Sequence, residues 1–182
     1  MPIEAARPSI PADDATIGGA YLVAARGALD GATRKIIHCL DQLSDDDLSW
    51  RQHESHNSIQ NLIQHLCGNL RQWIIHGVGG EHNVRNRPSE FSDRSHRSKS
   101  ELAAMLCDTV EKCDKVLADV PLARLLEHRK IQAFDTTLLA AIFDSVSHFV
   151  GHQHQIVYIT RLRLGERYQF QWTPASREQG AP

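Results

Sequence analysis

The chain has 182 residues, of which 41% are hydrophobic, and a formal net charge of −2. This length fits one domain with a substantial buried core, and the near-neutral charge supplies no basic excess for binding nucleic acid or an anionic membrane. The sequence has no apolar run of about 18 residues and no basic segment followed by an apolar run at its start. Neither a membrane span nor a signal peptide is therefore expected.

The first half of the chain predicts two long helices. Residues 1–15 contain three prolines and are predicted to form an unstructured lead. Across residues 16–43, apolar side chains recur at intervals of three and four, which indicates an amphipathic helix. After a polar connector, Asn57 or Ser58 can cap a second helix, which the glycines of residues 77–80 should end.

Residues 77–98 then form a long polar loop that is rich in arginine. Loops of this length in a compact domain are usually functional, interfacial or disordered. Arg85, Arg87 and Glu90 could line the mouth of a pocket for an anionic substrate. The alternative is a solvated loop with internal salt bridges.

The second half of the chain adds two more helices. Apolar residues mark a third helix over 102–117, stopped near Pro121, and a fourth over 138–164, ended by Gly165. No repeat and no alternating strand pattern of useful length is present, and residues 171–182 form an irregular tail. Four helices with polar connectors predict an all-α fold, a four-helix bundle over residues 16–170.

The cysteine pattern indicates a reduced compartment. The four cysteines include no CxxC pair. Cys39, Cys67 and Cys113 fall among the apolar positions of predicted helices, where a buried free thiol is usual. A cytoplasmic protein is the simplest interpretation.

The stretch SHFVGHQHQI concentrates three histidines in the last helix. His148 and His152 are four residues apart and therefore lie one turn apart on the same face, a spacing that lets two imidazoles chelate one metal in HExxH proteases. The residues between them include no glutamate, so a protease of that type is not expected. His154 lies roughly 200° around the helix from His152 and should not join the same site.

His65 in the second helix is the candidate third ligand. It lies between Leu62 and Leu66 and should face the bundle interior, where both ring nitrogens need partners. A hydrogen-bonded core histidine is the alternative. Three neutral imidazoles suit zinc, nickel, iron or copper, and they leave a coordination position open to water or substrate.

Two polar residues share the helical phase of these histidines. Asn69 and Gln155 are candidates for groups that orient the ligands or a substrate. Ordinary hydrogen bonding between helices is the alternative for both.

Three ordered segments, NSIQNLIQHLCGNLRQWIIHGVGG, RNRPSEF and HFVGHQHQIVYITRL, resemble the DinB-like superfamily of metal-binding four-helix bundles, in a branch of unknown function. The resemblance runs from about residue 19 to residue 170, and RNRPSEF marks the branch rather than the chemistry. It implies an up-down-down-up bundle, commonly dimeric, in which His65, His148 and His152 hold zinc or nickel. One departure stands out, because HQHQI replaces the expected HTGQI and places His154 where relatives have glycine.

The resemblance also implies a function. The superfamily includes thiol-dependent S-transferases, a thiol-dependent isomerase and many members with no assigned activity. We therefore expect a divalent-metal-dependent enzyme, with a small-thiol S-transferase as the leading hypothesis. A metal-dependent hydrolase fits the same ligands, and a non-enzymatic, stress-related metal-binding bundle is the remaining alternative. The expected partners are a small-molecule substrate such as a low-molecular-weight thiol and a second copy of the chain, without nucleic acid or membrane.

Overall fold

The computed structural model describes residues 16–82 and 84–171. The predicted lead, residues 1–15, lies outside the described residues, as do residues 172–182 of the predicted tail. None of the described helices is long and apolar enough to cross a membrane.

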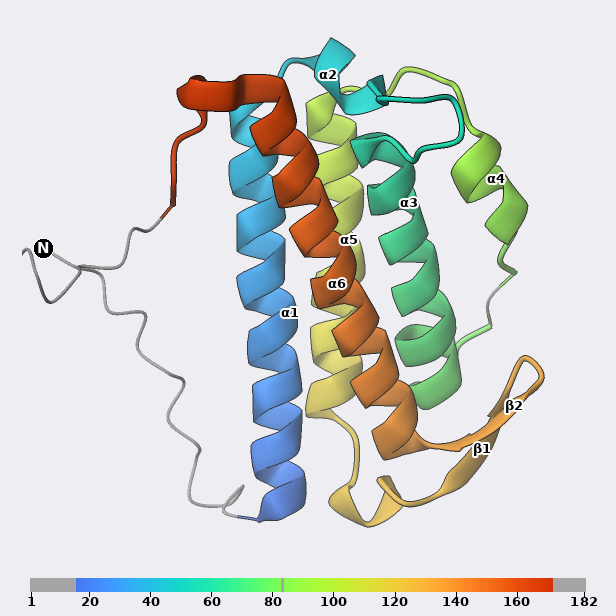
Figure 1. Cartoon of the computed structure of the whole chain (residues 1–182). Helices are drawn as coiled ribbons and strands as arrows, with labels where there is room; N and C mark the ends of the chain where they lie inside the picture. Colours follow the sequence, from blue (N-terminus) through green and yellow to red (C-terminus); the bar gives the residue numbers. More distant parts are fainter. Residues whose placement is uncertain (1–15, 83, 172–182) are drawn as a thin grey trace, which may run out of the picture.

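Four long helices form the body of the molecule: α1 (Ile17–Gln42), α3 (Ile59–Leu70), α5 (Lys99–Ala118) and α6 (Leu138–Leu164). Helix α1 packs against α5 and α6, and α3 packs against the same two helices from the other side. In Figure 1, α1 and α6 run upward while α3 and α5 run downward. The predicted all-α, up-down-down-up four-helix bundle is therefore confirmed.

Several short elements connect the long helices. They are α2 (Asp45–Ser49), the π-helix η2 (Arg71–Val78), α4 (Arg87–Ser92), the 3-10 helices η3 (Leu122–Arg124) and η4 (Gly165–Arg167), and the strands β1 (His128–Ile131) and β2 (Phe134–Thr137). The η2 segment continues α3 with wider turns, so that the amide of Gly79 donates to the carbonyl of Ile74, five residues back. π-Helical turns are rare and often lie close to functional sites.

The antiparallel hairpin of β1 and β2 was not predicted from the sequence. Its register pairs His128 with Thr137 and Ile131 with Phe134, and Gln132 in the two-residue turn has φ +56°. Strands of four residues are too short to show an alternating pattern, and the turn lacks the glycine or asparagine that usually signals a hairpin.

Side-chain caps explain where the long helices begin. The hydroxyls of Thr16, Ser58, Ser98 and Thr137 each accept a hydrogen bond from the backbone amide three residues further along. These bonds satisfy amides that have no partner within the helix. Ser58, rather than Asn57, is therefore the cap of α3, and at the other end of α6 Gly165 adopts φ +56°.

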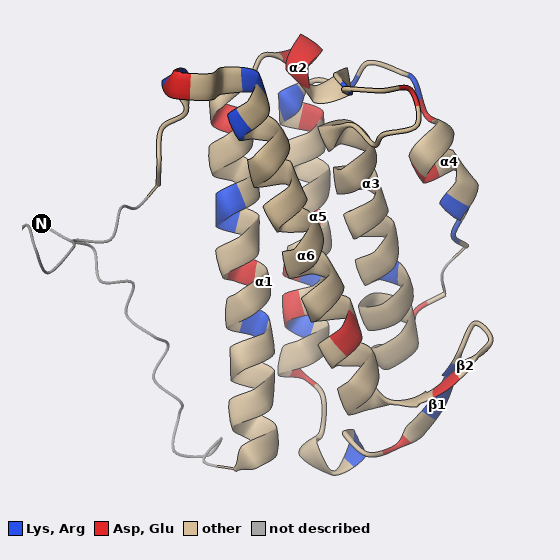
Figure 2. Ribbon diagram, in the orientation of Figure 1, with Lys and Arg blue, Asp and Glu red and all other residues tan. Residues whose placement is uncertain are grey.

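The core lies between the four helices. Its largest fully buried side chains include Phe149, Leu29, Ile36 and Leu66. The predicted burial of Cys39, Cys67 and Cys113 is confirmed, and all four cysteines are free. Acidic and basic residues occur on the same helices, as Figure 2 shows for α1.

The parallel course of α3 and α5 explains the long segment 79–98. Because both helices run downward, the chain must return along the length of the bundle before α5 can begin. In Figure 1 this return passes outside α3 and carries α4 with it, and α4 packs against α3. Residues 85–91 are thereby placed beside the middle of α3.

Candidate metal centre

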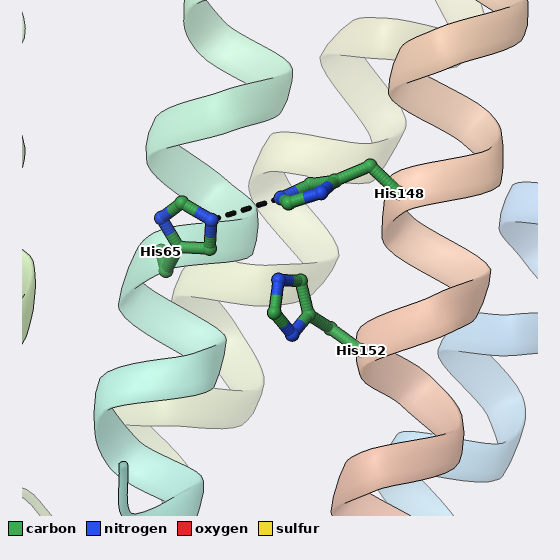
Figure 3. Close-up of side chains that lie close together, drawn as sticks. All are labelled: His65, His148 and His152. Carbon is green, nitrogen blue, oxygen red and sulfur yellow. Dashed lines mark hydrogen bonds between the residues drawn. The ribbon is translucent and has the colours of Figure 1, made fainter. Parts of the chain in front are cut away.

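His65, His148 and His152 meet between α3 and α6. One ring nitrogen from each lies within 4.8 Å of the others, the only such group of three or more His, Cys, Asp or Glu side chains among the described residues. Figure 3 shows the three rings turned toward one another across the gap between the two helices. The ring centroids of His65 and His152 are 5.1 Å apart, and those of His148 and His152 are 4.4 Å apart.

The helices account for this meeting. His148 and His152 lie one turn apart on α6 and so point in the same direction. Helix α3 packs against this side of α6 and presents His65 to both. His65 is buried, with 4% of its surface exposed, whereas His148 and His152 are half-buried. The cluster therefore has a closed side at α3 and a side open to solvent at α6.

Two of the three rings are hydrogen bonded through Nδ1, the nitrogen on the side away from the ring's Nε2. Nδ1 of His65 lies 2.9 Å from Oε2 of Glu90, and Nδ1 of His152 lies 2.9 Å from Oε1 of Gln155. An imidazole with an acceptor at Nδ1 carries its proton there and leaves Nε2 free as a ligand. Nε2 of His65 is hydrogen bonded to Nε2 of His148 at 2.8 Å, which Figure 3 draws as a dashed line.

The surroundings favour neutral imidazoles. Burial, followed by the nearby His152 and His65, lowers the pKa of His148 to about 4. Burial also lowers the pKa of His65, although the hydrogen bond that His65 donates to Glu90 opposes this effect. The His65–Glu90 contact is therefore a hydrogen bond between a neutral ring and a carboxylate at pH 7, despite its ion-pair distance.

This donor set fits a divalent transition metal. Metal binding requires the unprotonated ring nitrogen of each histidine, and the lowered pKa values of His65 and His148 favour the uncharged form of these two rings at neutral pH. Three imidazoles whose nitrogens converge, two of them with Nδ1 hydrogen bonded, match the ligands of open zinc and nickel sites.

The other residues singled out from the sequence fall into different places. Gln155 contacts the ligand candidate His152, as described above. Asn69 instead accepts a hydrogen bond from the hydroxyl of Ser145 at 2.8 Å, which ties α3 to α6 in the manner of an ordinary interhelical bond. His154 is exposed, as predicted, and its Nδ1 lies 2.9 Å from the carbonyl oxygen of Val150 on its own helix.

The segment RNRPSEF, residues 85–91, lies at the cluster, and its role is therefore wider than the branch marker predicted from the sequence. Arg85 and Glu90 form an ion pair, but a buried one rather than the solvated pair considered above. The Phe91 ring lies 4.8 Å from the ring of His65, and Arg87 stacks over Phe91 with its guanidinium carbon 5.1 Å from the ring centroid. The signal that could have revealed Glu90 is the need of an inward-facing histidine for an acceptor at its second nitrogen.

Comparison with known proteins places the chain in a family. Residues 16–177 match the family described as "Protein of unknown function (DUF1572)". The chain belongs to this family. No curated protein matches it.

Solved structures share the fold of this DUF1572 protein. A conserved protein from Enterococcus faecalis superposes with a TM-score of 0.65 at 16% identity, over 78% of this chain and 96% of that one. A DinB-like protein from Bacillus cereus superposes with a TM-score of 0.58, also at 16% identity, over 72% of this chain and 85% of the other. The chain thus shares its fold with a DinB-like protein, the fold that its motifs suggested.

Proposed function

We propose that this DUF1572 protein is a divalent-metal-dependent enzyme, with zinc or nickel bound by His65, His148 and His152, that transfers a low-molecular-weight thiol to an electrophile. The observation that supports the proposal is the convergence of three imidazoles at a site closed toward α3 and open toward solvent. A metal bound there would supply Lewis acidity, which lowers the pKa of a thiol that reaches the open position.

A cavity that is linked to the cluster through Gln155 offers room for the organic part of a substrate. It has a volume of about 380 Å³ and a largely apolar lining that includes Trp50, Tyr158, Ile159 and Leu162. Gln155 also lines it, and the same residue accepts the hydrogen bond from His152. Cavities of roughly 300–1,000 Å³ with a few polar groups are typical of small-molecule sites.

Two amides are proposed to orient the reactants. Gln155 connects the cavity to His152, so a substrate bound there would meet the cluster at its solvent side. The side-chain oxygen of Asn69 accepts a hydrogen bond from the hydroxyl of Ser145. The amide NH₂ group of Asn69 can therefore serve as a donor. Holding the reacting atoms close together in the correct geometry contributes a large part of the rate of two-substrate reactions.

An activity assay tests this proposal. The purified protein, loaded with zinc or nickel, would be mixed with bacillithiol, mycothiol or glutathione and a model electrophile, and thioether formation would be measured. We expect turnover in the wild type and its loss in His148→Ala. His154→Ala is the matched control, because His154 is exposed two residues from His152 and should leave the rate unchanged.

The outcomes separate the alternatives. Turnover of ester or amide substrates without any thiol would contradict the transferase proposal and support a hydrolase. A metal-loaded protein that turns over neither class would support a non-enzymatic, metal-binding bundle. A protein that binds no zinc or nickel would contradict all of these assignments.

We also propose that the chain forms a homodimer through the outer face of α6. Phe143 on this face is 59% exposed. About two turns further along the same face lies Gly151, where an added Cβ would meet nothing within 4 Å. Light scattering should give twice the chain mass for the wild type and the monomer mass for Phe143→Glu; a wild-type monomer would contradict the proposal.

A further inference from the structure

A buried ion pair lies directly behind His65. The side chains of Arg85 and Glu90 are 7% and 9% exposed. Nε of Arg85 donates to Oε1 of Glu90 at 2.6 Å, and Nη2 donates to Oε2 at 2.8 Å. Nη1 of Arg85 donates to Oε1 of Gln72 in the π-helix at 3.0 Å. This two-point pairing, anchored by a third bond, fixes the carboxylate in one orientation.

The contacts of His65 favour one position for its ring proton. Nδ1 lies 2.9 Å from Oε2 of Glu90 and 3.2 Å from Nη2 of Arg85. A carboxylate can only accept and a guanidinium can only donate, so Nδ1 can hydrogen bond to one of them at a time. Oε2 of Glu90 is the nearer of the two atoms, and Nη2 of Arg85 is itself directed at that oxygen. The arrangement is therefore consistent with Nδ1–H of His65 donating to Glu90.

Gly68 leaves the space that the carboxylate occupies. A Cβ at this position would overlap with Oε1 of Glu90, lie 2.8 Å from its Cδ and lie 3.0 Å from Nε of Arg85. The contacts with Glu90 are shorter than real Cβ atoms show, and the contact with Arg85 is tighter than most. Helix α3 therefore admits the Glu90 carboxylate behind His65 because residue 68 has no side chain.

We propose that Glu90, held by Arg85, is a positioning residue that fixes His65 as the Nδ1–H tautomer and keeps its Nε2 directed at His148 and His152. The long return segment 79–98 thereby becomes part of the metal centre, because it supplies both members of the pair. The inference rests on the proposed function to the extent that the cluster binds a divalent metal. Partners of this kind typically change metal affinity about 10- to 100-fold when removed.

The first test observes the tautomer in the metal-free protein. Long-range ¹H–¹⁵N correlation spectra distinguish Nδ1–H from Nε2–H rings, and His65→Asn assigns the His65 signals. We expect the Nδ1–H tautomer in the wild type and a shift toward Nε2–H in Glu90→Gln. An unchanged His65 tautomer in a folded Glu90→Gln protein would overturn the proposal.

The second test measures affinity by competition with a chelating dye for zinc. We expect Glu90→Gln to bind about 10- to 100-fold more weakly, and Gly68→Ala to weaken binding in the same direction by displacing the carboxylate. If Glu90→Gln does not fold because Arg85 is left buried without a partner, the double variant Arg85→Gln with Glu90→Gln removes both charges. Wild-type zinc affinity in these variants would overturn the proposal.

The control is a second arginine–carboxylate pair. Asp114 accepts from Arg26 at 2.6 Å and 2.8 Å between α5 and α1, so Asp114→Asn should leave both the tautomer and the zinc affinity unchanged. A wild-type protein that binds zinc but shows no thiol turnover would overturn the proposed function and leave this inference standing. A wild-type protein that binds no zinc would overturn the metal role, while the spectra still decide the tautomer.

Discussion

Nε2 of His65 lies 2.8 Å from Nε2 of His148, although the two residues are 83 positions apart in the chain. One proton can occupy the space between them. With Nδ1–H of His65 donating to Glu90, as proposed above, the donor in this bond is Nε2–H of His148. Binding a metal through Nε2 of His148 therefore requires its proton to move to Nδ1. The bond holds the rings close together before any ligand arrives.

Zinc or nickel should stabilise the folded protein. A ligand that binds only the folded state adds about 2.7 kcal/mol at 100 times its Kd, which corresponds to an increase in Tm of about 5–10 °C for a chain of this size. Differential scanning fluorimetry with and without metal would measure this increase in the wild type.

His148→Ala and His152→Ala should abolish the increase, because two imidazoles bind a metal weakly. His154→Ala should retain it, since this side chain is exposed and bonded to its own helix. An equal increase in all three variants would show that the metal binds elsewhere.

Stability of the metal-free protein should fall as the pH drops below about 6.5. Burial and the neighbouring histidines lower the pKa of His148 from 6.5 to about 4. Between these values the unfolded chain binds a proton at His148 and the folded chain does not, so acid favours unfolding. The contribution of His148 to the free energy of unfolding is thus complete above pH 6.5 and is lost as the pH falls toward 4.

Urea denaturation in the presence of EDTA at pH 7 and pH 5 measures this effect. His148→Gln removes the titrating ring, so the variant should lose less stability than the wild type between the two pH values. Equal losses in both proteins would contradict the lowered pKa of His148.

The faces of the helices could be predicted because they depend on local geometry. The spacing of apolar residues at threes and fours sets which side of each helix is buried, and His65, His148 and His152 fall on inward or adjacent positions for that reason alone. Packing α3 against α6 then brings them together. The outward position of His154 follows from the same periodicity.

The carboxylate behind His65 could not be predicted in this way. Glu90 reaches His65 because α3 and α5 run in parallel and the return segment passes over the middle of α3, a property of the topology rather than of any local pattern. The π-helical turns at Arg71–Val78 and the hairpin at 128–137 were missed for related reasons. The π-helical turns depend on how the helix packs. The strands of the hairpin are too short to show an alternating apolar pattern.

One cysteine per chain should react with Ellman's reagent in the native protein. Cys107 is exposed, whereas Cys39, Cys67 and Cys113 are buried. Burial raises the pKa of the Cys67 thiol to about 11 and raises the pKa values of Cys39 and Cys113 as well. At pH 8 these three are therefore protonated and inaccessible, and the thiolate is the reactive form.

The count of released thionitrobenzoate gives the test. We expect one equivalent in buffer, four in denaturant, and none in buffer for Cys107→Ser. Rapid reaction of a second thiol in buffer would mean that the bundle opens at one of the buried positions.

Replacing Gln132 by glycine should stabilise the protein. Gln132 has φ +56° in the turn of the hairpin, a left-handed conformation that costs roughly 1–2 kcal/mol for a residue with a Cβ. Glycine avoids this cost but loses more conformational entropy on folding, so the net gain in the free energy of unfolding should be about 0.5–1 kcal/mol. Ala133→Gly at the next position is the control, because no positive φ occurs there and only the entropic loss applies. Chemical denaturation of both variants measures the difference, and a Gln132→Gly protein less stable than the wild type would contradict the turn geometry on which the prediction depends.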